Sequence, residues 1–575
     1  MKNVKNLFGM AVMATALVGC SSNDNLNPNP NEGAGKAGEA YAKFTIQLPT
    51  VSGTRAVDPK TGADFNGGTA DEYAVKDAQL VIFEKLSDSD PEGAYKFVDT
   101  VNIGNLEPWT NNTPNTGVTR YANITAKLNG VSIDKIGGKY YALVILNNAG
   151  ESKVKLPTSG TYSEWNVAAK VKGAADFLNS DNGFYMANAP LYSTGEPTTL
   201  VPIKGVYSTK EEAQTKTATT VYVERGMAKV TVNGSDFKID DASSIYNTDK
   251  VKINNWTLDV LNKSTFPVHV TTGLKTDFDA IWTTPRFVAT GSTPQRVYWG
   301  IDPNYDKSTL TTVSACQDEF YIVDNNGKTY NGDPSSTFTW SANTTPLYCL
   351  ENTFDLDNMK QGQTTRVVFK ATYTPHNLTG TDKTFFMIGN NTQIWTKNAL
   401  VEQITSKAKE MRNSTAVVVT IKTDAPLLKG GSHLLSADDV TITDGTDITA
   451  TFDYATLNTK LGLNNTETDA NGNPKVGIKT YENGECYYIA RIKHFNELTP
   501  WTSGQTYGTD NATFLGRYGV LRNNWYDLRV SKISAPGYPD VPVVDPKTPD
   551  DEDTKYINVE VKILDWAKRS QEIQL

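Results

Sequence analysis

Apolar and polar residues alternate with a period of two in short runs along most of this sequence. In the run at residues 42–49, one face carries Ala42, Phe44, Ile46 and Leu48, and polar residues alternate with them. Alternation of this kind predicts a β-strand with one buried face. Similar β-type runs occur at residues 78–86, 139–148, 219–232, 251–262, 365–375, 414–423, 440–454 and 484–495. Thr, Asn, Tyr, Val and Gly are abundant, so we expect an all-β fold of many short strands.

One of these runs contains a charged break that divides the chain. Residues 219–232 are strongly β-type but are interrupted at Glu224–Arg225–Gly226. A chain of 575 residues has room for two or three domains. We therefore expect two β-sandwich domains with Greek-key connections, at residues 56–224 and 225–533. A single helix is expected at residues 398–412, where apolar residues follow a helical period.

The N-terminus has the pattern of a bacterial lipoprotein precursor. Two lysines precede a short apolar stretch that ends in Leu-Val-Gly-Cys at Cys20. We expect residues 1–19 to be a signal peptide and Cys20 to carry lipid. The next twenty residues are rich in Asn, Pro, Gly and Ser and are expected to be an unfolded spacer. Residues 20–55 would then form a lipidated propeptide that includes the first strand.

The C-terminus shows a second strand behind a proline-rich stretch. Residues 534–555 carry five prolines and then an acidic run, which predicts an extended linker. In residues 556–575, the side chains of Ile557, Val559, Val561 and Ile563 alternate with other residues. We therefore expect a half-buried strand at the end of the chain.

The two terminal strands have similar apolar stripes, and a lone arginine follows the first. Cleavage after Arg55, before Ala56, would release the first strand and open a slot lined by apolar side chains. The C-terminal strand of a neighbouring molecule fills such a slot by strand addition. Repeated head to tail, this contact does not close on itself and builds a filament.

The free energy gained by burying the C-terminal strand is large enough for such an exchange. Four buried aliphatic side chains contribute roughly 6–12 kcal/mol before the costs of association. Trp566 is expected to serve as an additional anchor. The plainer alternative is that the first strand, with Phe44, Ile46 and Leu48, stays in place. The C-terminal strand then completes its own sandwich.

The sequence offers little support for an enzyme or a cofactor. The net charge of −9 and pI of about 5.2 argue against nucleic acid as a partner. Three cysteines remain after Cys20, so at most one disulfide forms, and no CxxC or close histidine pair suggests a metal. The adjacent acids at 240–241 and 438–439, and the calcium-loop-like residues 466–475, are interpreted as turns. The alternative function is a monomeric glycan-binding surface lipoprotein of the outer membrane with tryptophan platforms, which include Trp256, Trp282, Trp299, Trp340, Trp395, Trp501 and Trp525.

Several of these features together resemble one family. A lipobox at Cys20, a strand and then "TRA" around Arg55 look like the precursors of Bacteroidales fimbrillins. "VERGMAKVTV" at residues 223–232 is similar to the segment between their two domains. "GRYGVLRNNWYDLRVSKISAPGYP" at residues 516–539 resembles their "RN-x-WY" region, and residues 559–566 resemble their terminal strand. Within the family, these motifs resemble those of the minor-fimbrium (Mfa-type) shaft subunits of Porphyromonas.

The resemblance implies a fold and a way of assembling. It implies two transthyretin-like sandwich domains, an outer-membrane lipoprotein precursor, and cleavage at Arg55–Ala56 by an arginine-specific, gingipain-type protease. It further implies donor-strand polymerisation into a type V pilus that serves adhesion, coaggregation and biofilm formation. The implied partners are further copies of the chain, anchor and tip or accessory subunits, and receptors on host or bacterial surfaces. No cofactor, metal or catalytic residue is implied.

Overall fold

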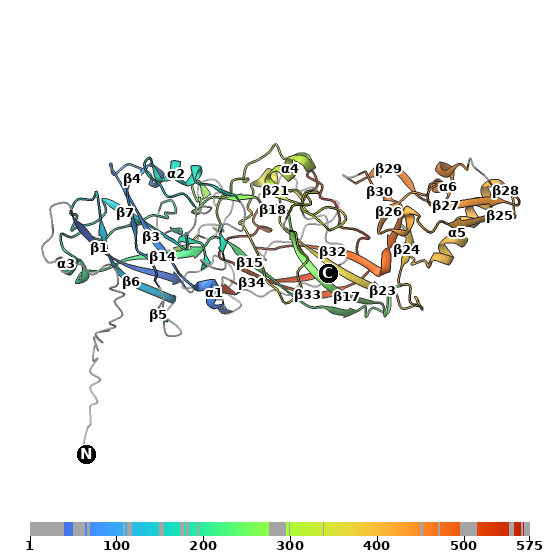
Figure 1. Ribbon diagram of the computed structural model, residues 1–575, viewed down its shortest axis with the longest axis horizontal. Helices are drawn as coiled ribbons and strands as arrows, with labels where there is room; N and C mark the ends of the chain where they lie inside the picture. Colours follow the sequence, from blue (N-terminus) through green and yellow to red (C-terminus); the bar gives the residue numbers. More distant parts are fainter. Residues whose placement is uncertain are drawn as a thin grey trace, which may run out of the picture.

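The computed structural model shows an elongated molecule with the first domain at one end and a smaller lobe at the other (Figure 1). It describes residues 39–49, 64–65, 69–106, 110–111, 118–148, 154–172, 177–179, 183–192, 195–274, 295–297, 299–336, 338–448, 452–469, 472–494, 515–550, 557–564 and 567–568. The expected lipidation position Cys20, the cleavage position Arg55–Ala56 and the anchor Trp566 lie outside the described residues.

The first domain, at residues 40–225, is built on one large sheet. This sheet contains both the first strand of the domain and its last strand. Its strands run in the order β4-β3-β7-β11-β14-β1-β6-β5, and β13 pairs with β7. The bounds are β1 Ala40–Pro49, β3 Ala78–Glu84, β4 Lys96–Asn102, β5 Thr110–Asn111, β6 Val118–Leu128, β7 Tyr140–Leu146, β11 Met186–Asn188, β13 Val201–Pro202 and β14 Thr219–Arg225.

Alternate residues of these strands pack into two separate cores. Leu80 and Ile82 of β3 join the apolar face of β1 in one cluster of buried side chains. Val81 and Phe83, on the opposite face, pack with Trp165 and other residues in a second cluster. Because both faces of β3 are covered, this strand reads as nearly continuous apolar sequence rather than as strict alternation.

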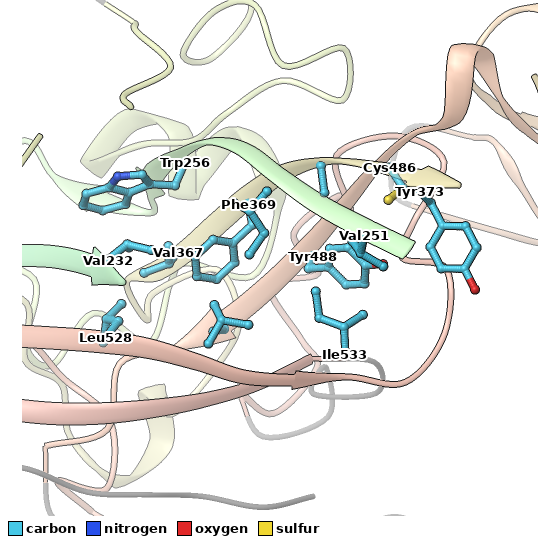
Figure 2. Close-up of a cluster of buried hydrophobic side chains, with 14 of the residues drawn as sticks. Val232, Val251, Trp256, Val367, Phe369, Tyr373, Cys486, Tyr488, Leu528 and Ile533 are labelled. Atoms are coloured by element: carbon cyan, nitrogen blue, oxygen red, sulfur yellow. The ribbon is translucent and has the colours of Figure 1, made fainter. Parts of the chain in front are cut away.

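The second domain is a sandwich of two four-stranded sheets. One sheet has the order β22-β15-β33-β34 and the other β16-β17-β23-β32. The bounds are β15 Ala228–Asn233, β16 Asp236–Lys238, β17 Lys250–Asp259, β22 Leu347–Cys349, β23 Arg366–Thr374, β32 Glu485–Arg491, β33 Trp525–Ile533 and β34 Ile557–Leu564. Between the sheets lie fully buried side chains such as Trp256, Phe369 and Tyr488 (Figure 2). The predicted all-β class with sandwich domains is confirmed.

A lobe that the sequence analysis did not predict is inserted between the neighbouring strands β23 and β32. It contains β24 Phe385–Ile388, α5 Lys397–Arg412, β25 Val417–Ile421, η6 Pro426–Leu428, β26 Gly431–His433, β27 Val440–Asp444, β28 Asp447–Ile448, α6 Tyr454–Lys460, β29 Asn464–Thr468, β30 Pro474–Val476 and β31 Ile478–Tyr481. The lobe has its own core, in which Leu400 and Ile404 of α5 pack on Val419 of β25. Helix α5 is the helix expected from the periodicity, and it lies at the far end of the molecule (Figure 1).

Short elements connect these layers. They are β2 Asp64–Phe65, α1 Ala70–Tyr73, η1 Glu92–Ala94, α2 Tyr162–Ala168, β8 Val171–Lys172, β9 Leu178–Asn179, β10 Gly183–Phe184, β12 Leu191–Tyr192, α3 Lys210–Gln214, β18 Leu261–Asn262, β19 Ser264–Thr265, β20 Gln295–Arg296, α4 Val313–Glu319, β21 Phe320–Tyr321, η5 Leu356–Asn358, η7 Glu482–Gly484 and β35 Ala567–Lys568. No helix in the described ranges is long and apolar enough to cross a bilayer.

Candidate functional site

The first strand occupies an interior position in the sheet of the first domain. β1 pairs in parallel with β14, where Phe44 lies opposite Thr219 and Ile46 opposite Val221. On its other edge it pairs antiparallel with β6 along its whole length. The predicted inward residues Phe44, Ile46 and Leu48 are buried, the least of them 2 % exposed. β1 is therefore an interior part of this domain and not a covering on its surface.

On the outward face of β1, Tyr41 packs in a small buried cluster with Tyr207 and Ala213, and the other contacts are polar. The ammonium of Lys43 donates to the carbonyl of Gln214 at 2.9 Å, and the Thr45 hydroxyl donates to the Asn123 side chain at 2.7 Å. Glu39, just before the strand, accepts from Lys127 at 2.8 Å. Each of these exposed contacts contributes about 1 kcal/mol or less. Ladder bonds and the buried stripe therefore hold the strand.

The C-terminal strand has a different position, at the edge of a sheet. β34 runs antiparallel to β33, with Ile557 opposite Ile533 and Leu564 opposite Trp525. In the described part of the chain β33 is its single ladder partner within that sheet. Two residues further on, β35 pairs with β2 of the segment that follows Arg55 in the sequence. The predicted inward residues Ile557, Val559, Val561 and Ile563 all belong to β34.

The "RN-x-WY" segment forms the junction between the two domains. Arg522 donates to the carbonyls of Pro267 and Phe266 and lies 3.5 Å from the carboxylate of Glu351. Asn523, in the left-handed region at φ 57°, accepts a hydrogen bond at 3.1 Å from the backbone N–H of Arg225, the last residue of β14. The segment therefore fastens the second domain to the strand that lies beside β1.

A buried charge cluster lies beside this contact. The ring of His269 stands between Glu224 of β14, at 2.7 Å, and Glu351, at 2.5 Å. Burial opposes a charge on the imidazole, but the two carboxylates outweigh it and raise the pKa of His269. The ring of His269 thus lies between a carboxylate of the first domain and one of the second.

A second ion pair crosses the same junction. Lys229 of β15 contacts Glu72 of α1 at 2.7 Å, and the Tyr348 hydroxyl donates to the same carboxylate at 2.6 Å. Burial acts to raise the pKa of Glu72, but these two donors lower it below its usual value. Sequence reasoning missed the junction because its members come from distant parts of the chain. The sequence does contain one signal for this junction, which is the charged residues of "VERG" and "RNNWY" within otherwise β-type sequence.

The structure gives structural roles to the groups considered for other chemistry. The carboxylate of Asp439 accepts from the backbone of Leu427 and Ser436. Of the residues 466–475, those that the structure describes, 466–469 and 472–475, belong to the paired strands β29 and β30 and the residues beside them. In the described ranges, no three His, Cys, Asp or Glu side chains are placed to hold a metal. The thiols of Cys316, Cys349 and Cys486 are free and buried, and burial raises the pKa of each to about 12.

An open cavity of about 620 Å³ lies at the outer end of the first domain. Lys204, Tyr207, Lys216 and Thr217 are among its lining residues. Tyr207 exchanges two backbone hydrogen bonds of 2.8 Å with Tyr41, so the cavity adjoins the beginning of β1. Two lysines, Lys204 and Lys216, lie in a lining that is otherwise uncharged and largely apolar, with Ile136, Val201 and Ile203 among its residues.

Comparison with known proteins gives a family match in the C-terminal part of the chain. The family model "Major fimbrial subunit protein type IV, Fimbrillin, C-terminal" matches residues 479–572, which include β32, β33 and β34. Residues 479–572 are therefore similar to the C-terminal region of fimbrillins, and the resemblance predicted from the sequence is confirmed there. No curated protein sequence matches the chain.

Solved structures give only a distant likeness. A fimbrilin of Porphyromonas gingivalis is 11 % identical with a TM-score of 0.38, and the alignment covers 92 % of this chain and 98 % of that one. The tip fimbrial protein Mfa3 of the same organism is 11 % identical with a TM-score of 0.28, covering 92 % and 100 %. A fimbrial assembly protein of Parabacteroides distasonis is 14 % identical with a TM-score of 0.27, covering 59 % and 87 %. At these scores the likeness adds nothing to the family match.

Proposed function

We propose that this chain is the structural shaft subunit of a type V pilus. It is made as an outer-membrane lipoprotein precursor that carries lipid on Cys20 and is cleaved after Arg55 by an arginine-specific, gingipain-type protease. Its C-terminal strand then enters the groove of the next subunit by donor-strand exchange. The observation that carries the proposal is the interior position of β1, which lies on the N-terminal side of Arg55.

Loss of β1 leaves a groove that requires a replacement strand. The ladder edges of β14 and β6 lose their partners, and apolar side chains such as Val221 and Leu128 lose their cover. An unpaired sheet edge beside exposed apolar surface pairs readily with another strand. The cleaved subunit is therefore an acceptor of a strand from elsewhere.

The C-terminal strand is the best candidate donor. β34 lies at the end of its sheet, so it leaves β33 without breaking a second ladder within that sheet. It also lies within the fimbrillin match. Its inward set Ile557, Val559, Val561 and Ile563 has the same period of two as Phe44, Ile46 and Leu48. An aliphatic stripe of this spacing suits a groove that previously held the apolar stripe of β1.

The remaining roles follow from the same assembly. Copies of the chain join head to tail, anchor and tip or accessory subunits complete the fimbrium, and the filament binds receptors on host or bacterial surfaces. No enzymatic activity is needed for this function. The glycan-platform alternative is weakened because the rings of Trp256 and Trp299 are at most 1 % exposed and offer no face to a sugar.

The N-terminal sequence and intact mass of protein sheared from the cell surface test the proposal. We expect a chain that begins at Ala56 without lipid. The variant Arg55→Ala should instead accumulate as lipidated precursor and form no filaments, whereas Lys60→Ala, with a nearby basic residue removed, should behave as wild type. A lipidated Cys20 at the start of filament subunits would overturn the proposal.

A further inference from the structure

The open cavity of the first domain is walled by three separate segments of the chain. One wall consists of β13 and residues just after it, from Val201 to Tyr207. A second consists of residues between 216 and 220, which follow helix α3 at one end of the molecule (Figure 1), and residues 136–138 form the third. Most of these residues are at least partly exposed, and none belongs to β1. The walls therefore lie in the part of the chain that follows Arg55.

Lys204 and Lys216 bring two positive charges to this cavity. Both residues are exposed, and among the described residues neither lysine forms an ion pair. The carboxylate of Glu212, on the adjoining helix α3, is held by Lys135 at 2.7 Å. The ammonium of Lys216 lies instead 5.7 Å from the centre of the Tyr207 ring. Two ammonium groups in an otherwise uncharged lining favour a ligand that carries a negative charge.

Tyr207 adds a hydroxyl group that has no hydrogen-bond partner in the described part of the chain. The residue is only 9 % exposed, and its ring packs with Tyr41 and Ala213. A Cβ atom on Gly205 would collide with this hydroxyl, so the glycine allows the ring to take its position. An unpaired polar atom on a fixed ring that lines a cavity is a suitable hydrogen-bond partner for a ligand.

The apolar part of the lining is open to water. Ile136 is 95 % exposed, and Val201 and Pro202 are not buried either. Thr217 and Thr220 place further hydroxyl groups in the same lining. Ligand pockets commonly combine apolar walls with a few polar groups that fix the orientation of the ligand. A sugar ring suits this combination, because it presents C–H groups on its face and hydroxyl groups along its edge.

We propose that this cavity binds an acidic sugar residue, which places its carboxylate at Lys204 and Lys216 and a hydroxyl at Tyr207. The C–H face of the ring packs on Ile136 and Val201. A volume of about 620 Å³ has room for one or two sugar rings. A ring-borne carboxylate is shared by uronic acids and sialic acids. The inference deepens the proposed function by naming a group that the filament recognises on a receptor. That role on the filament rests on the proposed function, whereas binding by the single chain does not.

Sugars that differ only in the acid group test the binding. Methyl glucuronide and methyl glucoside are titrated into the purified chain and followed by calorimetry. We expect the glucuronide to bind with a Kd of about 1 mM or below, and the glucoside to bind about tenfold more weakly or worse. The methyl glycoside of N-acetylneuraminic acid, titrated in the same way, shows whether sialic acids or uronic acids are preferred. Equal binding of glucuronide and glucoside, or inorganic phosphate that binds as tightly as both acidic sugars, would overturn the inference.

Substitutions in the lining test where the acidic sugar binds. The double variant Lys204→Gln/Lys216→Gln should weaken binding of the acidic sugars about tenfold or more and leave binding of the glucoside unchanged. Tyr207→Phe keeps the ring and its packing and should weaken binding about fivefold, because only the hydroxyl is lost. The matched variant Lys328→Gln/Lys475→Gln, at exposed lysines of the second domain and the lobe, should bind as wild type does. Acidic sugars that bind all these variants equally would refute the assigned site.

Filaments separate this inference from the proposed function. Filaments of the double lysine variant should assemble normally but bind a surface coated with the preferred acidic sugar about tenfold more weakly than wild-type filaments do. Normal filaments together with a chain that binds no acidic sugar would overturn this inference alone. Filaments that persist without residues 556–575 would instead refute donor exchange, and the titrations on the single chain would keep their meaning. The two failures are therefore distinguishable.

Discussion

The two terminal strands look alike in sequence but have different surroundings in the fold. β1 has a ladder partner on each edge and its apolar side chains lie in the core of the first domain. β34 is the last strand of its sheet. A stripe of period two therefore predicts that a strand will have a buried face, but not how many neighbours it will have. The number of paired neighbouring strands decides how much a domain loses when a strand leaves. A strand paired on one edge leaves at a lower cost than a strand paired on both.

Deletion of residues 40–49 should give the largest loss of stability in the monomer. Three large buried side chains, Phe44, Ile46 and Leu48, are lost, which together contribute roughly 5–9 kcal/mol. That is comparable with the whole stability of a typical domain. Hydrogen exchange should show β6 and β14 unprotected while the sandwich of the second domain stays protected. Addition of a peptide of residues 556–575 should restore protection, and a groove that stays protected without any strand would contradict this view.

His269→Gln should produce the next largest effect, at the junction that shares β14 with the groove. Removal of the central cation leaves Glu224 and Glu351 buried without it, with Arg522 nearby, at a cost of about 3–5 kcal/mol. Because the folded-state pKa is raised, the stabilisation is complete below pH ~6.5 and is lost as the pH rises through the higher folded value. The difference in unfolding free energy between wild type and variant, from denaturant titrations, should therefore shrink as the pH rises above about 6.5. A constant difference would mean that His269 is not charged.

Ile46→Ala should destabilise the precursor by about 2–5 kcal/mol, because it leaves a cavity at a fully buried position. Denaturant unfolding of the uncleaved protein measures this cost. In filaments made of cleaved subunits, the same substitution should have no effect, because β1 is no longer present. Filaments that become less stable would show that β1 is retained.

Deletion of residues 556–575 should have the smallest effect on the monomer and yet abolish filaments. β33 keeps its pairing with β15, so the thermal midpoint should change by only a few degrees. Differential scanning calorimetry measures this change, and electron microscopy shows whether filaments form. Unfolding of the truncated monomer would show that β34 is as integral to its domain as β1 is.

The local patterns of the sequence predicted the local elements well. The strand expected at 42–49 and the helix expected at 398–412 correspond to β1 and α5, because alternation and helical period depend only on near neighbours. The cap residues agree: Thr396 accepts from the N–H of Ala399, and Asn413 ends the helix in the left-handed region. Such signals need no knowledge of the rest of the fold.

Features that depend on distant residues were missed. The lobe was not predicted because strands such as β25 read like those of any sandwich, and only packing on α5 makes them a separate core. The proline-rich residues predicted an extended linker, but not that the carbonyls of Pro542 and Asp550 accept hydrogen bonds from side chains of β23 and β32. The two partners of His269, Glu224 and Glu351, are 45 and 82 positions away in the sequence. Sequence spacing alone gives no sign of such contacts.

The double pairing of β1 also has a mechanical consequence. If a neighbour's strand takes this place, a pull along that strand strains the hydrogen bonds to both β14 and β6 at the same time. These bonds then resist in shear and must rupture together. β34, on the edge of its own sheet, can instead be peeled from β33 one bond after another. The same strand would then be easy to unzip before assembly and hard to pull out afterwards, which is a useful property for a fibre under tension.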